Sequence, residues 1–145
     1  MTFALEVNKF KKKAEENAAK IVAKRFEMTC TKIVDETPVV SGKLKNNWTA
    51  TFTSPASGVD RKSEIDPARL LFGGVNDVPA MDSRNSIKEV VSKIKPSEIG
   101  NPLFFTNCLD YADDVEGQKS SKNYQGPKGF LRRNVLVAGL RSIKL

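Results

Sequence analysis

Apolar positions in the first quarter of the chain recur at steps of three and four residues, the spacing of one face of an α-helix. Lysine and glutamate fill most of the positions between them. Pro38 ends the pattern, because a proline disfavours helical backbone in the residue before it. We therefore predict a core-facing helix over about residues 8–36. Its apolar stripe consists of Phe10, Ala14, Ala18, Ile21, Val22, Phe26, Cys30 and Ile33.

The period changes after a turn signal at Ser41-Gly42. Trp48, Ala50 and Phe52 alternate with asparagine and threonine, which is typical of a strand with one apolar and one polar face. We expect the ring of Trp48, the only tryptophan, to cover the end of the long helix.

Residues 55–82 show little periodicity and are interrupted by proline and glycine. A connection of this length within a compact domain is usually functional or disordered. Its apolar run, Leu70, Leu71 and Phe72, suits a short strand or an adhesive loop tip, and we treat it as a candidate contact surface.

Further elements follow this loop. Ile87, Val90, Val91 and Ile94 fit one face of a helix that Asp82 or Ser83 would cap and Pro96 would end. Residues 103–106 are a short apolar run typical of a strand. Residues 109–117 have helical spacing, and residues 131–140 suit a helix better than a strand.

The length of 145 residues fits one domain, and the composition excludes several kinds of catalytic and metal site. The chain has no histidine, which removes Ser–His and Cys–His nucleophiles and the commonest metal ligand. Its two cysteines, Cys30 and Cys108, are too few for zinc, and we expect two buried, reduced thiols, which suit a reducing cytoplasm. No apolar run reaches the length of a membrane span, and no secretory signal is visible. We therefore expect no enzyme, cofactor, metal or membrane partner.

The net charge of +7 is unevenly distributed, because the segment from Lys119 to the end contains seven basic residues and no acid. Such a segment favours an acidic partner, whether nucleic acid, a membrane surface or an acidic protein face. Within it, Lys128, Arg132 and Arg133 suit phosphate contacts, contacts to a partner's carboxylates, or a solvated helix edge.

An acidic cluster lies just before this basic segment, at Asp113, Asp114 and Glu116. It suits either a solvated helix face or a docking point for a basic neighbour. We treat it, with the basic residues, as a candidate interaction surface.

Three stretches, in this order along the chain, resemble one protein family. The first, TPVVSGKLKNNW at residues 37–48, is similar to a TPVDTGxLRxxW-like turn that follows a long N-terminal helix. The second runs from a Lys-Pro turn at 95–96 through FFTN to YA and EG at 116–117, and the third is a QGPKGFLR segment at 125–132. Together they resemble the small minor-tail or tail-completion proteins of long-tailed bacteriophages. Ser41 stands where that family usually has threonine, and Gly126 where it has alanine. The motif residues are Pro38, Gly42, Leu44, Trp48, Asn107, Tyr111, Gly117, Pro127 and Gly129.

The resemblance implies an α+β domain, spanning residues 1–145, in which a long N-terminal helix packs on a small, mostly antiparallel sheet with one or two further short helices. It also implies a virion protein of the phage neck, assembled in the bacterial host cytoplasm. Its partners would be copies of itself in a six-fold ring, the tail tube protein and the head-completion or connector protein. Genomic DNA would pass through the lumen without sequence-specific binding. The alternative is a basic nucleic-acid-binding protein that uses the C-terminal segment.

Overall fold

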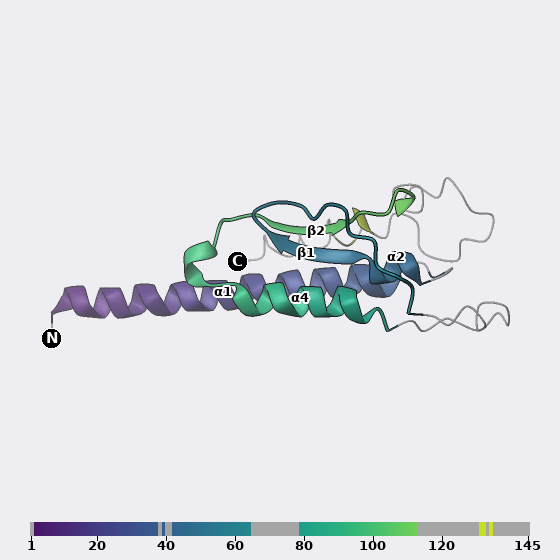
Figure 1. Cartoon of the computed structure of the whole chain (residues 1–145). Helices are drawn as coiled ribbons and strands as arrows, with labels where there is room; N and C mark the ends of the chain where they lie inside the picture. The colour runs from purple at the N-terminus through teal and green to yellow at the C-terminus, as the bar shows by residue number, and fades with distance from the viewer. Residues whose placement is uncertain are drawn as a thin grey trace.

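The structure is a computed structural model that describes residues 2–37, 39, 42–64, 79–112, 131, 132 and 134. It has an α+β fold, as expected, in which a long N-terminal helix accompanies a two-stranded antiparallel sheet and short helices (Figure 1). The predicted contact run at Leu70, Leu71 and Phe72 lies outside the described residues.

Helix α1 runs from Phe3 to Glu36, a length of 34 residues or about 50 Å. Thr37 leaves the helical conformation (φ −64°, ψ 126°), and its N–H donates to the Val34 carbonyl. The predicted end of the helix is therefore confirmed. The predicted start at about residue 8 is wrong, because the helix begins five residues earlier.

The sheet pairs β1 (Trp48–Phe52) with β2 (Leu103–Asn107) in antiparallel register, with Trp48 opposite Asn107 and Phe52 opposite Leu103. Both predicted strands are confirmed. The expected polar face of β1 is less exposed than the alternation indicated, because Thr49 is only 9% exposed and its hydroxyl accepts a hydrogen bond from Arg61.

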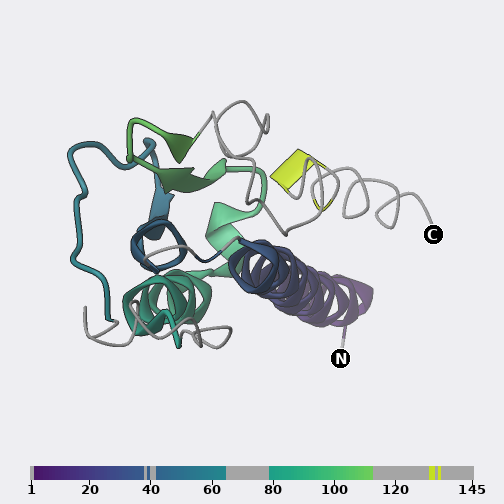
Figure 2. The same ribbon diagram turned by 90° about the vertical axis from the view of Figure 1, so that its right-hand side faces the viewer.

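Helix α4 (Met81–Lys93) lies beside α1, and the sheet covers this helical layer (Figures 1 and 2). The predicted apolar face of α4 is confirmed, since Ile87 and Val90 are buried and Val91 packs against the core. Trp48 stacks on Phe105 with ring centroids 5.0 Å apart. The core is formed by Cys30, Ile33, Val34, Trp48, Ala50, Ala80, Ile87 and Val90.

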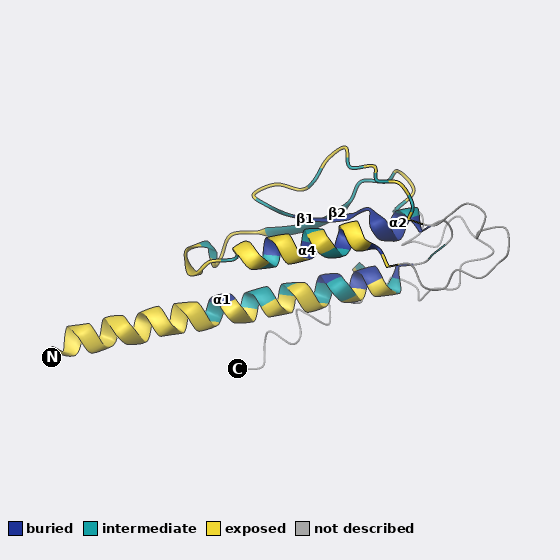
Figure 3. Ribbon diagram, turned by 60° about the horizontal axis from the view of Figure 1, so that its bottom comes forward, coloured by how far each residue is buried: buried dark blue, intermediate teal, exposed yellow. Residues whose placement is uncertain are grey.

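Only the C-terminal half of α1 contributes to this core. The helix extends well past the end of α4, which has 13 residues and a length of about 20 Å. Phe10, within this extension, is 76% exposed, and Ile21, on the side of α1 away from the core, is 55% exposed, so the prediction that they face the core is wrong. Figure 3 shows the N-terminal turns of α1 exposed on all sides.

Two short helices were not predicted, since each is too short to show a period. Helix α2 (Lys43–Asn46) begins after Gly42, whose positive φ of 76° suits a residue without a Cβ. The 3-10 helix η1 (Pro96–Glu98) connects α4 to β2. The N-cap residue of α4 is Ala80, whose side chain forms no capping hydrogen bond. The predicted cap at Asp82 or Ser83 is therefore wrong.

Candidate functional site

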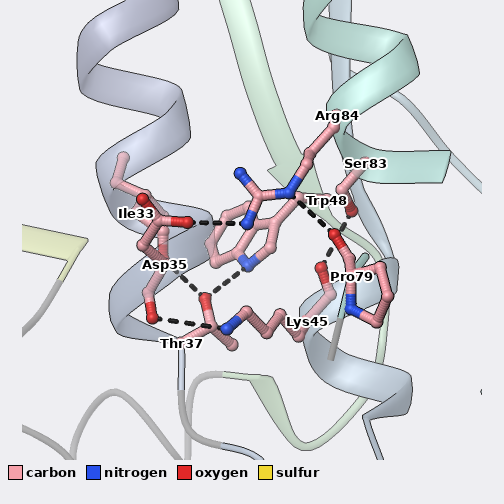
Figure 4. A network of polar contacts seen from close by, with 8 residues as sticks. All are labelled: Ile33, Asp35, Thr37, Lys45, Trp48, Pro79, Ser83 and Arg84. Atoms are coloured by element: carbon pink, nitrogen blue, oxygen red, sulfur yellow. Dashed lines mark hydrogen bonds and ion pairs between the residues drawn. The ribbon is translucent and has the colours of Figure 1, made fainter. Parts of the chain in front are cut away.

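The segment that carries the first family-like motif lies where four elements meet: the end of α1, α2, the start of β1 and the start of α4. We call this region the junction; it comprises residues 33–37, 43–49, 61–64 and 79–84. Figure 4 shows one side of it, where polar side chains connect the two long helices and β1.

Trp48 is tied to the last turn of α1. Its indole Nε1 donates to the Thr37 hydroxyl over 2.9 Å, and that hydroxyl donates to the Ile33 carbonyl over 2.7 Å (Figure 4). Trp48 and Thr37 are 4% and 3% exposed. The tryptophan therefore covers the end of the long helix, as its position in the sequence predicted, and its N–H fixes the orientation.

Asn47 is fully buried and joins α2 to the loop after β1. Its amide nitrogen donates to the carbonyls of Lys43 (2.6 Å) and Arg61 (2.9 Å), and its oxygen accepts from the Arg61 N–H (2.6 Å). The Arg61 guanidinium in turn donates to the carbonyls of Asn46 and Trp48, both at 3.0 Å. These bonds hold the loop against the start of β1.

The first turn of α4 is capped by side chains from elsewhere in the chain. The N–H groups at a helix start have no partner within the helix. Here the Asp82 N–H donates to the side-chain oxygen of the buried Asn46 (3.0 Å), and the Met81 N–H donates to Glu64 (2.7 Å). The Asn46 amide donates back to the Asp82 carboxylate over 2.8 Å. The arrangement replaces a local cap.

Two more contacts join α4 to α1 and α2. The Ser83 hydroxyl donates to the Lys45 carbonyl over 2.9 Å, and Arg84 forms an ion pair of 2.7 Å with Asp35 (Figure 4). Arg84 also donates to the Pro79 carbonyl. Because the buried amide side chains of the junction bond to backbone groups and to the Asp82 carboxylate, the network fixes the arrangement of the elements and has a structural role.

The structure places five of the predicted motif residues. Gly42, Leu44 and Trp48 belong to the junction or adjoin it, and Asn107 donates from its amide to the Leu44 carbonyl over 2.8 Å. Tyr111 is 41% exposed. The remaining motif residues, Pro38, Gly117, Pro127 and Gly129, lie outside the described part of the chain.

Of the predicted interaction residues, the structure describes Arg132 alone, and its side chain is exposed. The others lie outside the described residues. They are Leu70, Leu71, Phe72, Asp113, Asp114, Glu116, Lys128 and Arg133.

The N-terminal turns of α1 form a projecting segment that the sequence analysis missed. Every residue from 3 to 17, which we call the arm, is exposed, with Phe3 at 81% and Phe10 at 76%. At 3.6 residues per turn, the apolar stripe of the arm lies on the opposite side of α1 from Ala19, Cys30 and Ile33. This stripe continues along the helix through Phe3, Val7, Phe10, Ala14, Ile21 and Met28.

A signal for this second stripe is present in the sequence. Its members recur at 3, 7, 10, 14, 21 and 28, alternating steps of four and three with two positions skipped, which is the spacing of a helix that packs along another helix. The single stripe we inferred mixed members of both sides. A soluble helix that is apolar on two opposite sides buries one side in its own core and leaves the other available to a partner.

A pocket of about 310 Å³ lies where the arm leaves the body of the protein, and we call it the η1 pocket. Glu98 lines it, and one carboxylate oxygen of this residue, Oε2, is buried and has no hydrogen-bond partner among the described residues. The pocket is lined by Val22, Phe52, Thr53, Ile94, Glu98, Gly100, Asn101, Pro102 and Leu103.

The two cysteines differ in environment, and neither forms a disulfide. Cys30 is buried in the core, and the loss of solvation there raises the pKa of its thiol far above the ordinary range. Cys108 is half-buried, and its thiol donates to the Ala56 carbonyl at 3.3 Å. The expectation that both would be buried therefore holds only for Cys30.

Within the described ranges, no three side chains of the metal-ligating kind gather at one place. Nor does any described helix combine the length and apolar character that a membrane crossing requires.

Comparison with known proteins identifies no relative of this chain. No protein-family model, curated protein or solved structure matches the chain.

Proposed function

We propose that this protein is a structural subunit of the neck of a tailed bacteriophage. In this proposal, copies of the chain form a ring that completes or terminates the tail and joins it to the head connector, while DNA passes through the lumen. The family-like motifs suggested this function. The observation that carries it is the exposed apolar arm, because a large apolar surface left in water marks a site of interaction with another macromolecule.

The junction supports the same proposal. A subunit that works through its faces needs its elements held in a fixed relation, and the fully buried Asn46 and Asn47 provide part of this through bonds that join α2, the loop after β1 and α4. The arm is a continuous helix with the body-facing turns of α1, so its direction is fixed by the same core. Rigid, directed surfaces allow identical contacts to repeat from one copy to the next.

Sedimentation velocity over a range of protein concentrations, followed by electron microscopy of the heaviest species, tests this function. We expect closed rings with a central channel. Duplex DNA of random sequence should be retained weakly. A monomer at every concentration that binds such DNA, with an affinity that falls steeply as salt increases, would instead favour the basic nucleic-acid-binding protein.

A further inference from the structure

The η1 pocket combines a carboxylate side chain, that of Glu98, with apolar walls. Glu98 Oε2 is buried with no partner among the described residues, whereas Val22, Phe52 and Leu103 supply apolar surface. A buried carboxylate oxygen without a donor is unfavourable, and such a group in a folded protein calls for an explanation. A cationic side chain that enters the pocket from outside would meet the Glu98 side chain at the wall and could pair with its carboxylate.

The wall of the pocket also holds strained backbone. Thr53 has a positive φ of 59°, an outlier for a β-branched residue, and it is the centre of a tight turn in which the Ser54 N–H donates to the Phe52 carbonyl over 2.6 Å. Three-residue turns with a positive φ at the centre are rare and strained. Strain of this kind concentrates at sites that bind a partner.

The arm carries side chains that complement this pocket, an aromatic ring and a lysine ammonium. Phe10 is 76% exposed, and Lys13 lies one turn further along the helix, close enough for both side chains to contact the same site. A cavity of about 150 Å³ accommodates a benzene ring. The η1 pocket, at about 310 Å³, therefore has room for a phenyl ring together with the alkyl chain of a lysine.

The arm of the same molecule is unable to fill its own pocket. Val22 lines the pocket and belongs to the same straight helix as Phe10, 12 residues away, so the two positions are about 18 Å apart along the helix axis. Without a break in α1, the separation is fixed. An arm that enters the pocket must come from another molecule.

We propose that the η1 pocket receives the arm of a second copy of this chain, with Phe10 against the apolar walls and the Lys13 ammonium at Glu98. This inference rests on the proposed function and names the contact through which neighbouring copies assemble. Each copy carries one arm and one pocket on different parts of its surface. A contact between unlike surfaces closes into a ring when the rotation between copies permits.

Matched variants of the arm test the contact by its effect on self-association. Phe10→Ala should weaken association about tenfold or more, as expected for an aromatic anchor in a pocket. The control Leu5→Ala also removes an exposed apolar side chain of the arm, but from the opposite side of the helix, and should leave association within about twofold of wild type. Equal effects of the two substitutions would overturn the inference.

Glu98→Gln tests the electrostatic part. It keeps the size of the side chain but removes the charge, so association should weaken and depend less on salt. In a matched pair of double variants, Glu98→Gln should weaken association less when Lys13→Gln is already present. If the effects of the two substitutions simply add, Lys13 does not pair with Glu98.

Cross-linking locates the contact directly. One chain carries Ala14→Cys, on the stripe of the arm, and a second chain carries Asn101→Cys, at the pocket; both carry Cys108→Ser. We expect a short bifunctional thiol reagent to join the two different chains. Glu16→Cys, on the other side of the arm, is the control and should react much less.

The outcomes separate this inference from the proposed function. Rings that form without the arm-to-pocket cross-link would overturn the inference and leave the ring in place. The cross-link in a species that is only ever a dimer would support the arm contact and contradict the ring. A monomer at every concentration would overturn both.

Discussion

Replacing Asn47 by alanine tests whether the junction holds the elements of this fold together. The side chain is fully buried and forms three hydrogen bonds, two as a donor and one as an acceptor, with backbone groups of Lys43 and Arg61. Alanine removes all three and leaves those backbone groups without these partners.

The expected loss follows from these bonds. A hydrogen bond within a protein contributes about 1 kcal/mol net, and a buried group left without a partner costs about 1–3 kcal/mol. Because the Arg61 residue is half-exposed, water can reach part of the vacated site, which keeps the loss toward the lower end. We expect Asn47→Ala to reduce the free energy of unfolding by about 3 kcal/mol.

Urea denaturation, followed by the fluorescence of Trp48, measures this loss. With a slope of about 1–3 kcal/mol per molar urea, the transition midpoint should fall by about 1–3 M. The control Asn85→Ala removes the same side chain from an exposed position of α4 and should change the unfolding free energy by no more than about 0.5 kcal/mol. An Asn47→Ala loss below about 1 kcal/mol would refute the structural role of this network.

Four further predictions concern the cysteines, the core and the turn before α2. A thiol reagent should modify Cys108 in the folded protein but reach Cys30 only after unfolding; rapid labelling of both would contradict the burial of Cys30. Burial raises the pKa of Cys30, so above pH about 8.5 the unfolded chain releases the thiol proton while the folded protein keeps it. The unfolding free energy of the wild-type protein should therefore exceed that of Cys30→Ala by less at pH 10 than at pH 7, as measured by urea titration. Phe105→Leu removes the ring that stacks on Trp48 and should lower the unfolding free energy by about 1 kcal/mol, with a changed emission spectrum in the folded state; Gly42→Ala forces a side chain into left-handed backbone and should cost about 1–2 kcal/mol by the same assay.

The elements that the sequence predicted correctly are those with a clear local period. The alternation from Trp48 to Phe52 and the helical spacing of Ile87 and Val90 each reflect which side of an element is buried. The end of α1 was predicted from Pro38, because the restriction that proline imposes is also local.

The hydrogen bonds of the junction could not be predicted from a local period. Asn46 and Asn47 bond to partners 14–36 residues away in the sequence, and nothing in the local pattern indicates which polar groups will meet. The cap of α4 failed as a prediction for the same reason, since the capping atoms belong to Asn46 and Glu64.

The exposure of the arm was not predicted for a different reason. Periodicity shows that a helix has apolar sides, but it does not show where the rest of the body ends. Phe10 belongs to an apolar stripe on the side of α1 opposite the core residues, and it also lies beyond the reach of the sheet and α4. The η1 pocket combines residues from α1, the β1 turn and η1, so it required the tertiary structure.

The central claim is that the chain works through contacts with copies of itself and with the layers of a phage neck. Electron cryomicroscopy of intact virions, with this chain located in the map, tests it most directly. We predict a ring of copies between the head connector and the tail tube, with each arm against a neighbouring subunit. Particles that lack the chain, or that hold it as an isolated molecule away from the neck, would contradict the claim.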